Sequence, residues 1–363
     1  MLDFRVDEEQ KMLIDAINRF STERVREQFR DAEEEGHLPP ELVQAGWEIG
    51  WLQTAVPEQY GGFGEYSAVT GVLALEEYAY GDLATTFKIM SPNSIAIPLM
   101  LCGTEAQKEQ YLPHFVGESI PKLSSALMER VYQFNPHHLA TTAVSTADGF
   151  VLNGRKVYVP AAKEADTILV WANENGQTEG FLIDTGIEGI SVGAKDKLMG
   201  IKSLPTYELI LNDIKIPPSA KLGGEVGCDF DLLLNHSRVA ASATAVGMAR
   251  AAVEYAIAYA KQREQFGRPV AQNQSIAFLL ADMMSDVESM RMMVWEAAWL
   301  IDQGQEITKE ALLMKHFVDQ AVVRVTDGAV QVLGGYGYIR EYPVELWLRN
   351  ARGFATFDGM VTI

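Results

Sequence analysis

Apolar residues recur at helical spacing over roughly the first hundred residues of the chain. Ile17 and Phe20, for example, lie on one face of such a helix. Thr104 followed by Gln107 is the capping-box pattern that begins a further helix. These patterns predict an N-terminal helical domain over residues 1–121.

The hydrophobic period then changes from that of a helix to two, which is typical of strands. Residues 156–159 alternate in this way, and the dipeptides Asp148-Gly149 and Asn153-Gly154 are typical of tight turns. The pattern predicts a β domain over residues 122–223.

Long helical patterns return after the β segment. Three runs rich in Ala, Met and Leu cover residues 238–265, 274–303 and 308–333, and Arg238 is expected to open the first of them. Such runs indicate a C-terminal four-helix bundle over residues 224–363. The predicted fold class is therefore α+β, in the order helical, β, helical.

The composition of the chain limits its partners. Of its 363 residues 48% are hydrophobic, which is enough for a sizeable core, and 30 Lys and Arg against 49 Asp and Glu give a net charge of −19. This charge repels nucleic acid and anionic membrane surfaces, so we expect neither as a partner. We see no spanning segment and no signal peptide, which favours a cytoplasmic protein.

No metal site or disulfide framework is expected. Cys102 and Cys228 lie far apart in the sequence without metal-type spacing, and we expect both in the core. His137 and His138 fall in an expected strand, where adjacent side chains point to opposite faces and do not share a metal. No Gly-x-Gly-x-x-Gly motif stands between a strand and a helix, which argues against a Rossmann nicotinamide site.

Two segments in the last third carry the strongest functional signal. One is Tyr259–Pro269 with Gln272-Asn273-Gln274 after it, and the other is Gln331–Glu345. Taken singly, Arg263 reads as a solvated helix residue and Gly334-Gly335 as a helix C-cap. Together, at this spacing, the segments resemble the two signatures of the acyl-CoA dehydrogenase family. The order of the three domains matches that family over nearly the whole chain.

The resemblance implies a flavoprotein that binds FAD and an acyl-CoA thioester. In the family the Arg of the first signature reaches the flavin pyrophosphate, the Phe packs on the adenine, and the glycine turn brings backbone close to the adenosine. Carried over, the adenosine-side residues are Arg263, Phe266, Gln274, Gln331, Gly334 and Gly335. Because these groups serve a flavin bound mainly by the neighbouring subunit, the resemblance implies a homologous partner subunit, in a dimer of dimers or a mixed tetramer.

The residues that hold the flavin ring in the family are mostly replaced. The Thr-Glu-Pro-x-x-Gly-Ser-Asp loop aligns with Met128–Asn135, where Glu129 alone is kept and Gln133-Phe134 replaces Gly-Ser. The Trp-Ile-Thr segment becomes Tyr158-Val159-Pro160. Tyr158 still offers a ring for stacking, but Pro160 has neither a hydroxyl nor an N–H. We therefore expect FAD to be absent from the isolated chain.

The second signature ends in Asp358-Gly359-Met360-Val361-Thr362 in place of Glu-Gly-Thr-x-Gln, and Leu346 replaces its usual Lys or Arg. Asp358 thus takes the position of the family's catalytic base, which removes a proton beside the thioester, although Asp is shorter than Glu by about 1.5 Å. Asp-Gly is equally a common turn pair. Arg238 matches a family Arg near the acyl-CoA pocket, with a structural salt bridge as the alternative.

Three functions remain open at this point. The first is an acyl-CoA dehydrogenase-type enzyme that performs α,β-dehydrogenation with FAD and passes electrons to an electron-transfer flavoprotein. The second is a subunit of a mixed oligomer that completes a partner's FAD site. The third is flavin-free proton transfer on an acyl-CoA. The pattern favours the second, because residues serving a neighbour are kept while those serving the chain's own flavin are lost.

Overall fold

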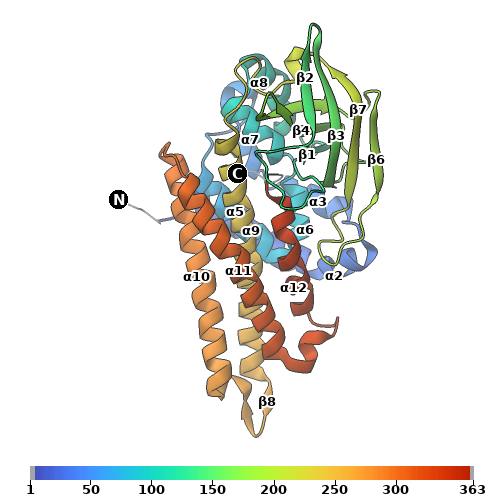
Figure 1. Cartoon of the computed structure of the whole chain (residues 1–363). Coiled ribbons are helices and arrows are strands. Elements are labelled where there is room, and N and C mark those ends of the chain that lie inside the picture. The colour runs from blue at the N-terminus through green and yellow to red at the C-terminus, as the bar shows by residue number, and fades with distance from the viewer. Residues whose placement is uncertain (1–4, 360–363) are drawn as a thin grey trace.

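The computed structural model describes residues 5–359, so Met360–Thr362 of the second signature lie outside the described residues. The chain folds in the predicted order of a helical part, a β part and a helical bundle (Figure 1). Among the described helices, none is long and apolar enough to cross a membrane.

The N-terminal part consists of short and medium helices. They are α1 (Glu8–Phe20), α2 (Arg26–Glu35), α3 (Pro40–Trp47), α4 (Trp51–Ala55), α5 (Ala68–Gly81), α6 (Leu83–Ile89), α7 (Asn93–Cys102) and α8 (Glu105–Tyr111). The capping box predicted from Thr104 and Gln107 is confirmed at the start of α8. Nearly every residue of α5 is buried, because α5 packs against α1 on one side and the long bundle helix α9 on the other.

The β part is one sheet in which strand order differs from chain order. Its strands are β1 (Leu123–Ala126), β2 (Thr142–Thr146), β3 (Gly149–Pro160), β4 (Thr167–Glu174), β5 (Gln177–Asp184), β6 (Ile190–Lys195) and β7 (Thr206–Ile216). The order is β1-β4-β2-β3-β7-β6, with β5 paired to β4. The pairs β1–β4 and β2–β4 are parallel and the others antiparallel.

Two sequence predictions in this part are wrong. Asn153-Gly154 is not a turn; it lies inside β3, where the pairing with β7 shifts register between Leu152 and Gly154. Glycine here accommodates a bulge rather than a chain reversal. His137 and His138 lie in an irregular segment, not in a strand, and His137 Nε2 is 3.5 Å from the Asp231 carboxylate.

The C-terminal part is the helical bundle. Its elements are α9 (Phe230–Gln262), the hairpin β8 (Glu264–Gln265) and β9 (Arg268–Pro269), α10 (Gln274–Asp302), α11 (Thr308–Leu333), the 3₁₀ turn η6 (Gly334–Tyr338), α12 (Val344–Gly353) and the 3₁₀ turn η7 (Phe354–Phe357). The first helix was predicted to open at Arg238, but it begins eight residues earlier. Those residues include Asn235, His236 and Ser237, which are poor helix formers held here by burial.

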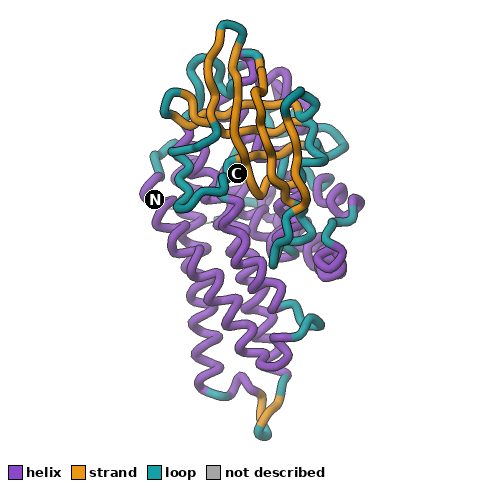
Figure 2. Tube along the Cα trace, turned by 45° about the vertical axis from the view of Figure 1, so that its right-hand side comes forward, coloured by secondary structure: helices purple, strands orange, loops and turns teal. Residues whose placement is uncertain are grey.

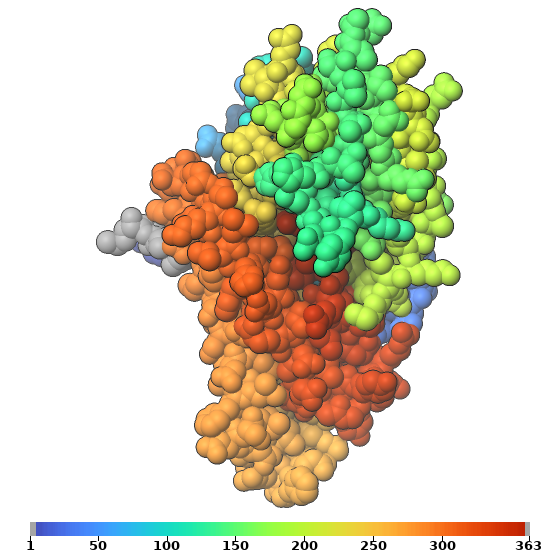
Figure 3. All heavy atoms as spheres, viewed as in Figure 1, coloured from blue at the N-terminus to red at the C-terminus, as the bar shows by residue number. Residues whose placement is uncertain are grey.

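The sheet covers one end of the bundle and the β8–β9 hairpin closes the other (Figures 1 and 2). In the space-filling view the dark red C-terminal end is recessed between the β part and the orange helices (Figure 3). Cys102 ends α7 and Cys228 precedes α9. Both are free thiols, and they lie at the edge of the main hydrophobic core, packed against it but only partly buried. Within residues 5–359 no group of three metal-ligating side chains is found.

Candidate functional site

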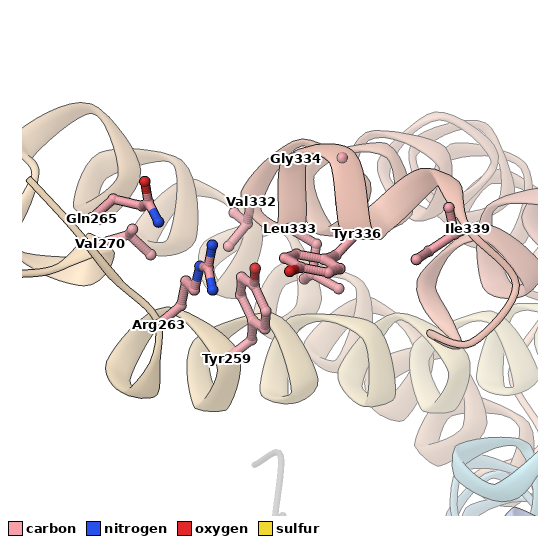
Figure 4. Close-up of a pocket in the computed structure, with 10 residues that line it drawn as sticks. Tyr259, Arg263, Gln265, Val270, Val332, Leu333, Gly334, Tyr336 and Ile339 are labelled. Carbon is pink, nitrogen blue, oxygen red and sulfur yellow. The ribbon is translucent and has the colours of Figure 1, made fainter.

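A pocket of 440 Å³ lies where the end of α9 and its hairpin meet the end of α11 (Figure 4). Arg263, the C-cap residue of α9, and Gly334 and Gly335 of η6 line it, so the structure brings these three predicted residues together. The Arg263 guanidinium lies 5.2 Å from the centroid of the Tyr336 ring. Such stacking orients a planar cation while leaving its N–H groups available to an anion.

The glycines leave the backbone of this pocket open. Gly334 has φ +60° and ψ −130°, a conformation that L side chains rarely adopt, and its N–H donates to the carbonyl of Gln331. A Cβ added at Gly334 or Gly335 has no atom of the described residues within 4 Å. The space beside η6 is therefore available to a group from outside the chain.

The other predicted adenosine-side residues lie beside this pocket rather than in it. Phe266, at the hairpin tip, is 98% exposed, and Gln274 and Gln331 also face solvent. Gln265 lines the pocket instead, a residue that the sequence analysis missed and that no pattern distinguishes from its neighbours.

Asp358 and Arg238 meet at the opposite end of the bundle. Asp358 follows η7, and its carboxylate lies 3.9 Å from Arg238 Nε. The side chain is 27% exposed overall, yet its Oδ1 atom is buried and accepts no hydrogen bond from any described residue. Burial raises the pKa of Asp358, while Lys315 and Arg238 act against the rise.

Gly359 fixes the turn that carries Asp358. Its N–H donates to Ser237 Oγ over 2.6 Å, and its φ of +77° favours glycine. A Cβ at this position would lie 2.1 Å from Leu127 Cδ2. The turn therefore packs between the β part and α9. Asp358-Gly359 forms a turn, as the dipeptide predicts, and this turn fixes the position of the Asp358 carboxylate.

In the loop that aligns with the family's flavin-ring loop, two of the replaced side chains pack against the protein core. Met128 and Phe134 pack against the main hydrophobic core. Gln133 has φ +52°, a conformation suited to the glycine that the family has there. The replacements therefore remove hydrogen-bond donors and place a bulky side chain on backbone whose conformation suits glycine.

Glu129 survives in this loop for a structural reason. It accepts hydrogen bonds from Lys156 Nζ at 2.7 Å and from the N–H groups of Ala140 and Thr141. Lys156 is fully buried and also donates to the carbonyl of Leu127. Burial lowers the pKa of Lys156 to about 8 although the Glu129 carboxylate opposes this. Lys156 is a further residue that the sequence analysis missed.

Tyr158 lies at a strained point of β3. Its φ is +55°, and the pairing with β7 shifts register between Lys156 and Val159. The ring lines a cavity of 160 Å³ with Met199, Arg349, Arg352 and Phe357 among its walls. This volume is below the ~300 Å³ at which small-molecule sites typically begin.

Arg238 and Arg263 both lie on or at the end of α9, 25 residues apart. At 1.5 Å per residue the separation is about 37 Å. The pocket at Arg263 and the turn at Asp358 therefore lie in separate regions of the chain, near the two ends of α9.

Known protein families match the chain over all three of its parts. The acyl-CoA dehydrogenase N-terminal domain matches residues 7–118, the middle domain residues 125–214 and the C-terminal domain residues 231–363. The chain belongs to the acyl-CoA dehydrogenase family. The fold predicted from the two signatures is confirmed.

Relatives within the acyl-CoA dehydrogenase family include enzymes that act on acyl-CoA. The caffeyl-CoA reductase-Etf complex subunit CarC of Acetobacterium woodii is 34% identical, over 97% of this chain and 95% of that protein. Butyryl-CoA dehydrogenase from Megasphaera elsdenii has a TM-score of 0.90 and 32% identity, covering 99% of this chain and 96% of that one. A complex of PigA with FAD has a TM-score of 0.90 at 26% identity, with the same coverage of each chain.

Proposed function

We propose that this chain serves the α,β-dehydrogenation of an acyl-CoA thioester as one subunit of a mixed oligomer, in which it completes the FAD site of a homologous partner. The observation that supports this proposal is the contrast between two half-sites, one at Arg263 and the glycine turn and the other at the flavin-ring loop. The pocket at Arg263 and the glycine turn is open, whereas in the flavin-ring loop Met128 and Phe134 replace polar and small residues and pack against the core.

The open half-site fits the adenosine diphosphate end of FAD. No carboxylate of the described part of the chain pairs with Arg263 within 4.0 Å, so its guanidinium is available to phosphate oxygens. The bare backbone at Gly334 and Gly335 permits close approach of a ligand. The exposed rings of Phe266 and Tyr338 supply flat apolar surfaces for a base.

The half-site at the flavin-ring loop does not fit the flavin ring. Met128 offers no donor, Pro160 has no N–H, and the remaining cavity at Tyr158 is 160 Å³. FAD, when bound in the partner, supplies the acceptor for the hydride of the substrate's β carbon. This chain's contribution to that flavin is Arg263 and the turn at Gly334, which bind and orient its far end.

Exposed apolar side chains on the outer bundle helices support assembly. Phe278 and Met292 on α10, with Leu312 and Leu313 on α11, are exposed, and such surface usually marks an interface. We infer a dimer of dimers or a mixed tetramer. An electron-transfer flavoprotein is the proposed redox partner, because the relative CarC is named as a subunit of an Etf complex.

The test is flavin content with and without a partner. We expect the isolated chain to purify without stoichiometric FAD, and a complex with a homologous subunit bearing an intact flavin-ring loop to carry about one FAD per two chains. Arg263→Ala in this chain should lower that content, because it removes a charge-assisted contact worth about 1.5–3 kcal/mol.

The matched control is Arg268→Ala on the same hairpin, whose guanidinium is held by Asn273 Oδ1 at 2.7 Å. It should leave the flavin content unchanged. Full FAD occupancy of the isolated chain, insensitive to Arg263→Ala, would overturn the proposal and make the chain a self-sufficient dehydrogenase.

A second candidate function rests on Asp358. A buried, unpartnered carboxylate oxygen beside Arg238 suits a base that takes the proton next to a thioester. Exchange of that proton with deuterated water, followed on an acyl-CoA by NMR, tests it. Asp358→Asn should abolish exchange and Asp358→Glu should retain it, whereas exchange that survives Asp358→Asn assigns the proton transfer to another group.

A further inference from the structure

The turn that carries Asp358 is held from α9 by two successive residues. Ser237 Oγ accepts the N–H of Gly359 over 2.6 Å, and Arg238 Nε faces the Asp358 carboxylate at 3.9 Å. Arg238 is itself oriented, because its Nη1 donates to Asn235 Oδ1 at 3.2 Å. The Asn235 amide in turn donates to Thr308 Oγ1 at 2.8 Å, which joins α9 to the start of α11.

Helix α11 supplies a second cation to the same place. Lys315 is buried, donates to Asp319 Oδ1 at 2.5 Å and lies 5.0 Å from the ring centroid of Phe354. Its position fixes an ammonium group under the η7 turn that leads to Asp358. The charges that face Asp358 are Arg238 from α9 with Lys315 and Asp319 from α11, while the β part contributes the apolar Leu127.

These four side chains form a charge-balanced cluster. Two cations, Arg238 and Lys315, oppose two carboxylates, Asp319 and Asp358. Lys315 pairs with Asp319. Arg238 lies 3.9 Å from the Asp358 carboxylate, which is too far for a hydrogen bond, and Asp358 Oδ1 accepts none from the described residues. A carboxylate with one oxygen unengaged is available to accept a proton, as a base requires.

We propose that Ser237 and Lys315 are positioning residues for Asp358. Ser237 fixes the turn through the Gly359 amide, and Lys315 places an ammonium group against Phe354 of the η7 turn that carries Asp358. The inference rests on the proposed role of Asp358 as a base, but both of its parts are measurable on the isolated chain without any activity.

The Lys315 part is tested by a double-mutant cycle in urea unfolding at pH 7. Asp358→Asn removes a buried charge, so we expect it to raise the unfolding midpoint, and to raise it further in a Lys315→Met background where that charge has lost a partner. Lys309→Met, an exposed lysine of the same helix, is the control and should show no coupling to Asp358→Asn. Equal shifts in the Lys315→Met and parent backgrounds would overturn this part.

The Ser237 part is tested by amide hydrogen exchange of peptides covering residues 354–359. Ser237→Ala should speed exchange there about tenfold, with the rest of α9 unchanged, and Ser237→Thr should restore protection. Ser242→Ala is the matched control, because Ser242 is buried on the same helix and its Oγ has no partner in the described structure. Exchange that is unaffected by Ser237→Ala contradicts the proposal.

The reaction gives a third readout. If Asp358 exchanges the substrate proton, Lys315→Met should move the pH midpoint of exchange upward and Lys315→Arg should return it, since the lost cation makes the charged carboxylate less favourable. An unmoved midpoint in Lys315→Met counts against the inference. If the parent chain shows no proton exchange, while the coupling in urea unfolding and the effect of Ser237→Ala are both observed, the role of Asp358 as a base is wrong. The contacts of Ser237 and Lys315 with the turn are then still supported.

Discussion

Glu129 resembles a remnant of a flavin site when it is read in the sequence, and its contacts give it a different role. It ties the start of the loop to its end through Lys156, Ala140 and Thr141. No spacing pattern links Glu129 to Lys156, because their contact arises from β3 running beside the loop, where Val157 N donates to Met128 O. Asp358 and Arg238 were identified separately from motifs, and their proximity is visible only in the fold.

Breaking the Glu129–Lys156 pair should be costly. Lys156→Met leaves a buried carboxylate without its counter-charge, and removing one partner of such a pair typically costs about 3–5 kcal/mol of unfolding free energy. Urea unfolding of the isolated chain measures it. Arg155→Ala is the neighbouring control, since its side chain is 69% exposed and 3.9 Å from Glu208, and it should cost less than about 1 kcal/mol. A loss in Lys156→Met as small as that of the control would show that the pair is dispensable.

At the scale of elements, the helices with clear periodicity were predicted well. The predicted runs 274–303 and 308–333 correspond to α10 and α11 within one residue. The start of α9 was missed because it is buried on nearly all sides, so that no polar face marks its period. Asn153-Gly154 was predicted as a turn although it forms a bulge in β3, because glycine is common in both structures. Helix caps were easier to predict, since the capping box at the start of α8 was identified from Thr104 and Gln107.

The cap of α6 should make stability depend on pH. Asp82 accepts hydrogen bonds from the N–H and hydroxyl groups of Thr85, and burial raises its pKa to about 6. A carboxyl group with a folded-state pKa above its unfolded value costs stability above pH 6, and this cost disappears as pH falls below about 4.

Asp82→Asn keeps the cap acceptor and removes the charge. It should therefore stabilise the chain at pH 7, by up to about 3 kcal/mol, with no gain at pH 3.5. Unfolding midpoints at the two pH values check this. Thr104→Ala, a neutral cap change, should cost about 1 kcal/mol at both. Destabilisation by Asp82→Asn at pH 7 would mean that Arg26 and the Thr85 bonds outweigh the burial of the charge.

At the scale of the whole molecule, Arg238 beside the Asp358 turn and Arg263 at the open pocket are about 37 Å apart along α9. Sequence motifs identified the residues of both regions. They did not show how the side chains of Met128 and Phe134 pack, because that depends on the fold. In the proposed function, the open pocket at Arg263 serves the flavin of another chain. Assembly therefore decides how many flavins the oligomer holds.

Restoring the flavin-ring side should change that number. In the variant Met128→Thr, Gln133→Gly, Phe134→Ser and Pro160→Thr, three hydroxyl donors return, one bulky ring leaves the loop, and the strained φ of residue 133 falls on glycine. We expect this variant, expressed alone, to bind FAD at up to one per chain, because every copy then has both half-sites. Absorbance of the purified protein measures the ratio. Adding Arg263→Ala should lower the occupancy again, since in an oligomer of identical chains that residue serves the neighbour's flavin. A fourfold variant that folds like its parent and still purifies without flavin would show that these side chains are not what excludes the ring.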